Sequence, residues 1–157
     1  MYEDRVERAV ANFMEGYNCS QSVVEAFADL YGFTREQALL MAASFGGGIG
    51  RMRLTCGAAC GMFMLAGLQT GTTTGSDRAG KSYNYKVVQE LASRFKAQTG
   101  SITCMELLNL RKQQRLSPEA EERTPDYYAQ RPCARMIRIA AQLFADFLAE
   151  QPGGVRR

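Results

Sequence analysis

Residues 54–68 read LTCGAACGMFMLAGL and carry no charged side chain. A helix that is apolar on every side is typical of an element enclosed by other helices. The stretch is shorter than the about 20 apolar residues that a membrane span needs. Its small residues would let neighbouring backbones approach closely. The segment therefore predicts a buried helix over about Thr55–Leu68, at the centre of a soluble helical bundle.

The sequence on both sides of this segment also has helical periodicity. Apolar residues recur at three- and four-residue spacing. They predict further helices over about 6–14, 19–30, 34–45, 82–99, 104–110 and 132–149. The polar stretches 71–80 and 111–131 are expected to be loops, the second partly helical. We expect an all-α fold, a compact single-domain bundle of five to seven helices over residues 1–150, followed by a flexible tail over 151–157.

Composition excludes several classes of protein. The 157 residues have a formal net charge of only +3, and no basic stripe interleaved with aromatic residues suggests a nucleic-acid interface. The N-terminus lacks the apolar core of a signal peptide. We therefore expect a cytoplasmic protein that binds neither membrane nor nucleic acid. Several predicted helices are apolar over more than one face, which is compatible with a homodimer.

Five cysteines and the complete absence of histidine direct attention to thiol chemistry. In a reducing cytoplasm stable disulfides are rare, so cysteines there are packing residues, metal ligands or redox groups. The lack of histidine excludes Cys–His catalysis and histidine metal ligands.

Four of the cysteines follow residues that favour the start of a helix. Asn18, Thr55, Thr103 and Pro132 directly precede Cys19, Cys56, Cys104 and Cys133. The free N–H groups and the positive end of the helix dipole at such a position lower the pKa of a thiol. These cysteines also share the apolar faces of their helices. A bundle that aimed the four helix starts at one place would form a single thiol site, whereas the simpler alternative is that each cysteine only fills the core.

The glycine-rich stretch 46–51 (GGGIGR) directly precedes the central helix. Consecutive glycines can form a nest of backbone N–H groups that accepts an anion. Gly47, Gly48 and Gly50 are therefore candidates for binding a cofactor or an anionic group. A tight turn that leads the buried helix into the core explains the same residues, and the two interpretations are compatible.

Five segments, taken in order, resemble the C-GCAxxG-C-C family, which is named for a redox role. They are NCSQ at 18–21, FGGGIGR at 45–51, CGAACG at 56–61, residues 95–104 and Cys133. The resemblance spans about residues 15–145. It implies a redox-active thiol site at Cys19, Cys56, Cys104 and Cys133. Cys60 lies at an x position of the CGAxxG motif, inherits no role from the family, and is expected to be a packing residue.

Three functions remain open at this point. The first is thiol–disulfide chemistry, in which a reactive cysteine attacks a disulfide or peroxide and a neighbour resolves the product. The chain would then be a thiol-dependent oxidoreductase with a redox partner or small-molecule substrate that the sequence does not identify. The second is a metal ion or iron–sulfur cluster held by Cys19, Cys56, Cys104 and Cys133. The third is a non-catalytic helical binding protein with packing cysteines.

Overall fold

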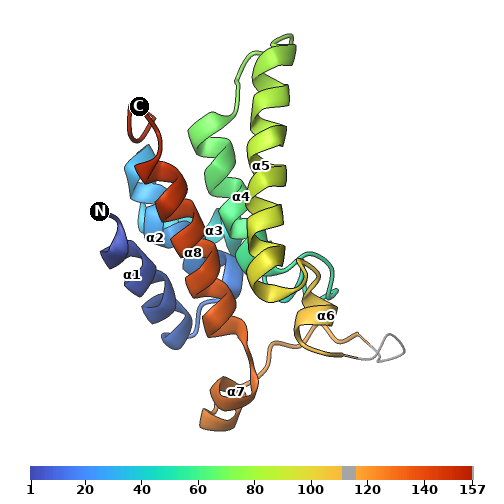
Figure 1. Ribbon diagram of the computed structural model, residues 1–157. Helices are drawn as coiled ribbons and strands as arrows, with labels where there is room; N and C mark the ends of the chain where they lie inside the picture. The colour runs from blue at the N-terminus through green and yellow to red at the C-terminus, as the bar shows by residue number, and fades with distance from the viewer. Residues whose placement is uncertain (111–115, 157) are drawn as a thin grey trace.

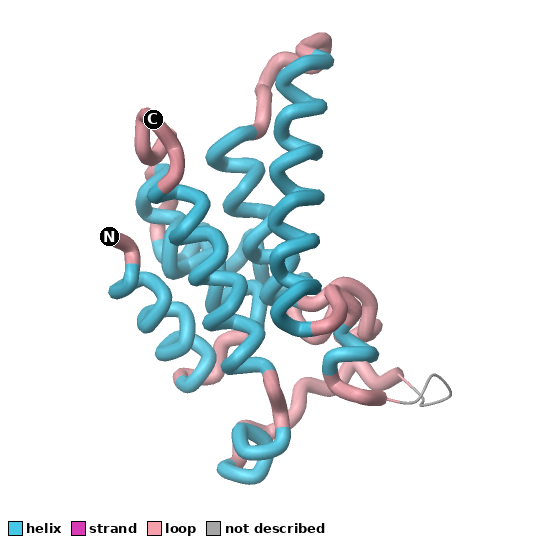
Figure 2. Tube along the Cα trace, viewed as in Figure 1, coloured by secondary structure: helices cyan, strands magenta, loops and turns pink. Residues whose placement is uncertain are grey.

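The computed structural model describes residues 1–110 and 116–156, and its regular structure is helical (Figure 2). The α-helices are α1 (Glu3–Met14), α2 (Cys19–Ala28), α3 (Arg35–Ala42), α4 (Gly57–Thr70), α5 (Arg78–Thr99), α6 (Cys104–Leu107), α7 (Pro125–Gln130) and α8 (Cys133–Ala149). Short 3₁₀ turns, η1 (Asp29–Tyr31) and η2 (Ala43–Phe45), follow α2 and α3. The all-α prediction is confirmed. The eight helices of the described residues exceed the predicted five to seven, because the short α7 lies within the stretch 111–131 that is expected to be a partly helical loop.

Two helices share the centre of the bundle. Helix α4 packs against α2, α5 and α8, as the apolar segment predicts, and its residues 57–62 are all buried. Helix α2 packs against α1, α3, α4 and α8 and is buried almost throughout. Figure 1 shows α5 standing beside α4, and the short helices α6 and α7 at the end of the bundle where α8 begins. None of the described helices is long and apolar enough to cross a membrane.

Local capping sets where the helices begin. The Asn18 side chain accepts from the Gln21 N–H while the Gln21 side chain accepts from the Asn18 N–H, a capping box that starts α2 at Cys19. Helix α5 begins at Arg78, four residues before the predicted start, because the Asp77 carboxylate accepts from the Gly80 N–H. Helix α4 begins at Gly57, so Cys56 occupies the N-cap position and not the predicted first turn.

The predicted loops and tail are only partly irregular. Within the predicted loop 111–131, residues 116–124 are irregular and α7 follows them, while 111–115 lie outside the described residues. The terminal segment, expected to be a flexible tail, lies against α4. Gln69 of α4 donates to the Gly154 carbonyl and accepts from the Arg156 N–H, and Val155 packs on the core.

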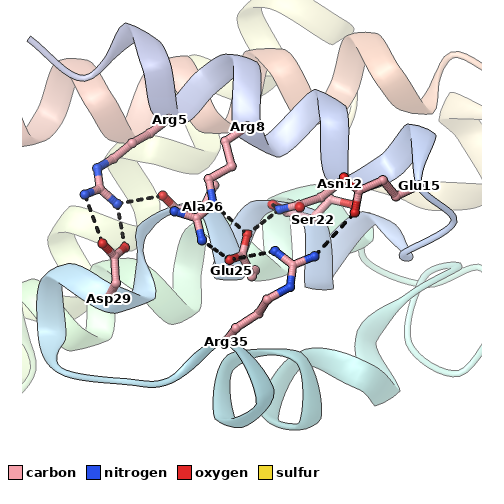
Figure 3. Close-up of polar contacts among 9 residues, drawn as sticks. All are labelled: Arg5, Arg8, Asn12, Glu15, Ser22, Glu25, Ala26, Asp29 and Arg35. Atoms are coloured by element: carbon pink, nitrogen blue, oxygen red, sulfur yellow. Dashed lines mark hydrogen bonds and ion pairs between the residues drawn. The ribbon is translucent and has the colours of Figure 1, made fainter.

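A buried carboxylate ties the first three helices together, as Figure 3 shows. The Glu25 side chain of α2 is only 1% exposed and pairs with Arg8 of α1 and Arg35 of α3. The amide of Asn12 also donates to Glu25, at 2.6 Å. These partners satisfy a charge that would be costly to bury alone. The network fixes α2, and hence Cys19 at its start, relative to α1 and α3.

Candidate functional site

The four helix-start cysteines line one cavity of about 450 Å³. Cys19 and Cys133 are the first residues of α2 and α8, Cys104 is the first residue of α6, and Cys56 caps α4. Cys56 and Cys104 are buried, whereas Cys19 and Cys133 are partly exposed. All five cysteines of the chain are free thiols. The structure therefore brings together the four residues that the sequence selects.

A short backbone pairing holds Cys56 and Cys104 on the same wall of the cavity. Thr55 and Thr103, the residues just before them, form an isolated antiparallel bridge. The Cys56 N–H donates to the Ile102 carbonyl and the Cys104 N–H donates to the Leu54 carbonyl, each at 2.6 Å. The helical periodicity gave no signal for this pairing, which spans only one residue of each segment.

The glycine loop allows Cys104 to approach the cavity. Gly48 has a φ of +74°, and a Cβ there would lie 2.6 Å from the Cβ of Cys104. Any side chain at Gly48 would therefore be strained and would displace the cysteine. The Gly50 N–H donates within the loop, to the Ser44 carbonyl at 2.7 Å. Gly47, Gly48 and Gly50 all line the cavity, and binding of an anion by their backbone stays a prediction.

The titrations of Cys19 and Cys133 are coupled through a hydrogen bond between their thiols, in which Cys19 keeps the proton. That hydrogen bond lowers the pKa of Cys133 to about 7, with help from the positive charges of Arg131, Arg123 and Arg53 and against the effect of burial. The same hydrogen bond, followed by burial, raises the pKa of Cys19 well above its usual value. The pair therefore loses its first proton near neutral pH and its second only at much higher pH.

The other two cavity cysteines are unlike Cys133. Burial raises the pKa of Cys56 to about 12, although the N–H groups of Ala59 and Ala58 favour its thiolate. Burial also raises the pKa of Cys104, against a favourable contact with the Arg53 guanidinium, whose Nη1 lies 3.7 Å from Cys104 Sγ. A lowered pKa, expected for at least one helix-start thiol, is found among the four at Cys133, whereas at the other three desolvation and the thiol pair outweigh the dipole.

Cys60 lies apart from the site. It is buried, its Sγ is 3.8 Å from the Thr55 carbonyl oxygen, and burial raises its pKa to about 11. It does not contribute to the wall of the cavity. These observations agree with the predicted packing role and with a raised pKa.

Sequence reasoning missed the arginines of the cavity. Of the residues that the structure describes, Arg51, Arg53, Arg123 and Arg131 line it together with one acidic residue, Glu121. Three of these five residues come from the stretch 111–131, which the sequence predicts only as a polar surface loop. The available signal was proximity along the chain, since Arg131 precedes Cys133 by two residues and Arg53 precedes Cys56 by three.

A metal ion is the other group that clustered cysteines commonly hold. Across residues 1–110 and 116–156, no three side chains of histidine, cysteine, aspartate or glutamate are placed to hold one. The cysteines share a cavity, but the described side chains are not placed as a metal-ligand shell. What the cavity offers directly is a coupled thiol pair in which Cys133 has the lowered pKa.

Comparison with known proteins agrees with the cysteine pattern. The family model described as "Putative redox-active protein (C_GCAxxG_C_C)" matches residues 17–147. No curated protein and no solved structure matches the chain. The matched range begins just before Cys19, ends within α8 beyond Cys133, and contains every residue of the thiol cavity except Gly16. The chain therefore belongs to the C_GCAxxG_C_C family.

Proposed function

We propose that the chain carries out thiol–disulfide exchange, with Cys133 as the nucleophile and Cys19 as the resolving thiol. The observation that carries the proposal is that the four helix-start cysteines line one cavity, where interaction with the Cys19 thiol lowers the pKa of Cys133 to about 7. A thiol with a pKa near the ambient pH is the best attacking group, because it combines a substantial thiolate fraction with high nucleophilicity.

The exchange balances as follows. The Cys133 thiolate attacks one sulfur of a substrate disulfide, forms a mixed disulfide and releases the other half as a thiolate. Cys19, after losing its proton to that thiolate or to water, attacks Cys133 Sγ. This second step forms a Cys19–Cys133 disulfide and releases the rest of the substrate. The substrate disulfide gains two electrons and the cysteine pair loses two, and a dithiol reductant would restore the pair.

Cys56 and Cys104 supply a second dithiol in the same cavity. Their raised pKa values keep both protonated while Cys133 reacts. By two further exchanges they can take over the disulfide from Cys19 and Cys133, with their two protons passing to the reduced pair. The four thiols together would hold four reducing electrons, delivered two at a time.

The direct test is a titration of fully reduced protein in redox buffers without oxygen, followed by alkylation and mass mapping of the cysteines. The proposal expects reversible loss of four alkylatable thiols, with a Cys19–Cys133 disulfide present at partial oxidation. Replacing Cys133 with Ser should prevent oxidation of Cys19, while replacing Cys60 with Ala should leave the titration unchanged. Absence of any reversible disulfide would refute the proposal.

A metal site at the same cysteines is the competing interpretation from the sequence. The described residues do not place three ligands together, so we derive no step through a metal. Elemental analysis of the same anaerobic preparation separates the two functions. Stoichiometric zinc, or iron with sulfide, that protects the four cysteines from alkylation would favour the competing site.

A further inference from the structure

The thiol cavity carries a strong excess of positive charge. Among residues 1–110 and 116–156, four arginines and one glutamate line it, which gives these residues a formal charge of +3 with neutral thiols and +2 with Cys133 ionised. The whole chain has a net charge of only +3. The cavity that holds Cys133 therefore carries as much net positive charge as the whole chain, and such a cavity attracts anions.

The arginines are held in place before any ligand arrives. Arg123 donates to the carbonyls of Phe13 and Tyr17, and its guanidinium lies 4.5 Å from the centre of the Phe13 ring. Arg131 lies over the Tyr127 ring at 5.6 Å. Positions fixed by stacking and hydrogen bonds reduce the entropy that binding costs.

One carboxylate serves three of these arginines. Glu121 pairs with Arg131, with Arg51 at 3.2 Å and with Arg53 at 4.0 Å. The side chains of Arg53 and Arg131 are only 11% and 19% exposed, whereas that of Glu121 is 39% exposed. The partly desolvated guanidinium groups therefore share one half-exposed acid. A carboxylate from another molecule would have to compete with Glu121 for these arginines.

We propose that the substrate of this site is a small disulfide that carries carboxylate groups, bound by Arg53 and Arg131 in place of Glu121. This inference rests on the proposed function and adds the chemical class of the substrate. The volume of about 450 Å³ is that of a small-molecule pocket. The bond changes are those already given, with Cys133 attacking a substrate sulfur.

The experiment compares three small disulfides of different charge on fully reduced wild-type protein. They are dithiodipropionate with two negative charges, bis(hydroxyethyl) disulfide with none, and cystamine with two positive charges. Each rate of Cys133 oxidation is divided by the rate of the same disulfide with mercaptoethanol, which removes differences in intrinsic reactivity. We expect dithiodipropionate to exceed the neutral disulfide about tenfold at low salt, with most of the excess lost at high salt.

Charge variants test the named residues. Replacing Glu121 with Gln should raise the preference for dithiodipropionate over the neutral disulfide several-fold, and replacing Arg131 with Gln should lower it. The ratio of the two rates cancels any change in the thiolate fraction of Cys133. Glu119→Gln and Arg135→Gln are matched controls, because both residues are exposed and lie outside the cavity wall. If Arg131→Gln does not fold, the rate ratio of the Glu121→Gln variant and the salt dependence of the wild type still test the inference.

A ligand-binding experiment tests this inference independently of the proposed function. Suberate has the length of dithiodipropionate but no disulfide, and octanediol is its neutral match. Suberate should raise the melting temperature of Cys133→Ser protein, with a larger shift for the double variant with Glu121→Gln, and octanediol should not. Binding of suberate without any disulfide chemistry would refute only the proposed function. Equal normalised rates for all three disulfides, or no suberate binding, would overturn the inference even where Cys19 and Cys133 form a disulfide.

Discussion

The Cβ of Cys19 lies directly against Gly57, so that a Cβ at Gly57 would stand 3.1 Å from it and 2.8 Å from the Phe45 carbonyl oxygen. Gly57 is the glycine of the CGAxxG motif and the first residue of α4. The motif thus places Cys56, which caps α4, next to Gly57. Because Gly57 has no side chain, Cys19 at the start of α2 can approach it closely. The close approach of these two helix starts is what places Cys19 and Cys56 on one cavity.

Replacing Gly57 with Ala should destabilise the fold by about 1–3 kcal/mol, because the added methyl group overpacks a rigid contact. It should also move Cys19, weaken its hydrogen bond to Cys133 and raise the pKa of Cys133. Urea unfolding and the pH dependence of alkylation measure the two effects. The control is Gly67→Ala, also in α4, where a Cβ meets nothing within 4 Å. That change should be neutral or stabilise by up to about 1 kcal/mol, and equal losses for both variants would contradict the contact.

The sequence predicted most of the fold, because its helices are marked by apolar periodicity and by local caps. Asn18 and Thr34 each start a helix through a capping box, and Gly100 closes α5 in the left-handed conformation. Each of these capping residues lies within a few residues of the helix end that it determines. The predicted start of α5 was wrong because the side chain of one residue, Asp77, sets it by capping the helix.

The cavity was predictable only in part, for a physical reason. Placement of the four cysteines at helix starts is a local property, and the structure brings them together. Their pKa values depend on burial and on which thiols meet, and these are properties of tertiary packing. The arginine cluster contains Arg53 together with Arg123 and Arg131, which lie about 70 residues further along the chain. No local sequence pattern therefore predicted it.

The reactivity of Cys133 toward iodoacetamide should reach half of its maximum at about pH 7, well below the about 8.5 of a free thiol. Because the folded pKa is lowered, the thiolate also stabilises the fold above about pH 8.5, and this contribution is lost as the pH falls through about 7. Replacing Cys19 with Ala removes the hydrogen-bond donor and should raise the midpoint. Replacing Cys60 with Ala is the control. A midpoint unchanged by the Cys19 variant would show that the arginines alone activate Cys133.

Replacing Glu25 with Ala should cost about 3 kcal/mol of stability, because it leaves Arg8, Arg35 and Asn12 without their shared acceptor. Glu90→Ala is the control, since its pair with Arg94 is exposed and worth at most about 0.5 kcal/mol. Denaturant unfolding measures both. A loss no larger than that of the control would mean that Glu25 does not anchor α2.

The same residue predicts a dependence of stability on pH. Burial alone would raise the pKa of Glu25, but hydrogen bonds from Arg8 and Asn12 hold it below the ordinary 4.5. A carboxylate with a lowered folded pKa contributes stability that is present above about pH 4.5 and is lost as the pH falls below it. The wild type should therefore lose more stability on acidification than Glu25→Ala does. Parallel curves for the two proteins would contradict this assignment.

Cys56 and Cys60 lie one turn apart at the start of α4, and replacing them should have different effects on the number of thiols that can be reversibly oxidised. Cys56 faces the cavity, whereas Cys60 packs beneath it with its thiol toward the Thr55 carbonyl. A disulfide between them would be strained, because residues four apart on a helix tilt their Cβ atoms in the same direction.

Since disulfides consume thiols in pairs, a cavity that retains Cys19, Cys104 and Cys133 can oxidise only one pair. Replacing Cys56 with Ser should therefore reduce the reversibly oxidised thiols from four to two, and Cys60→Ala should leave four, counted by alkylation and mass mapping after oxidation. The reverse result would assign the motif to the other thiol, and equal losses would make Cys60 a fifth member of the site.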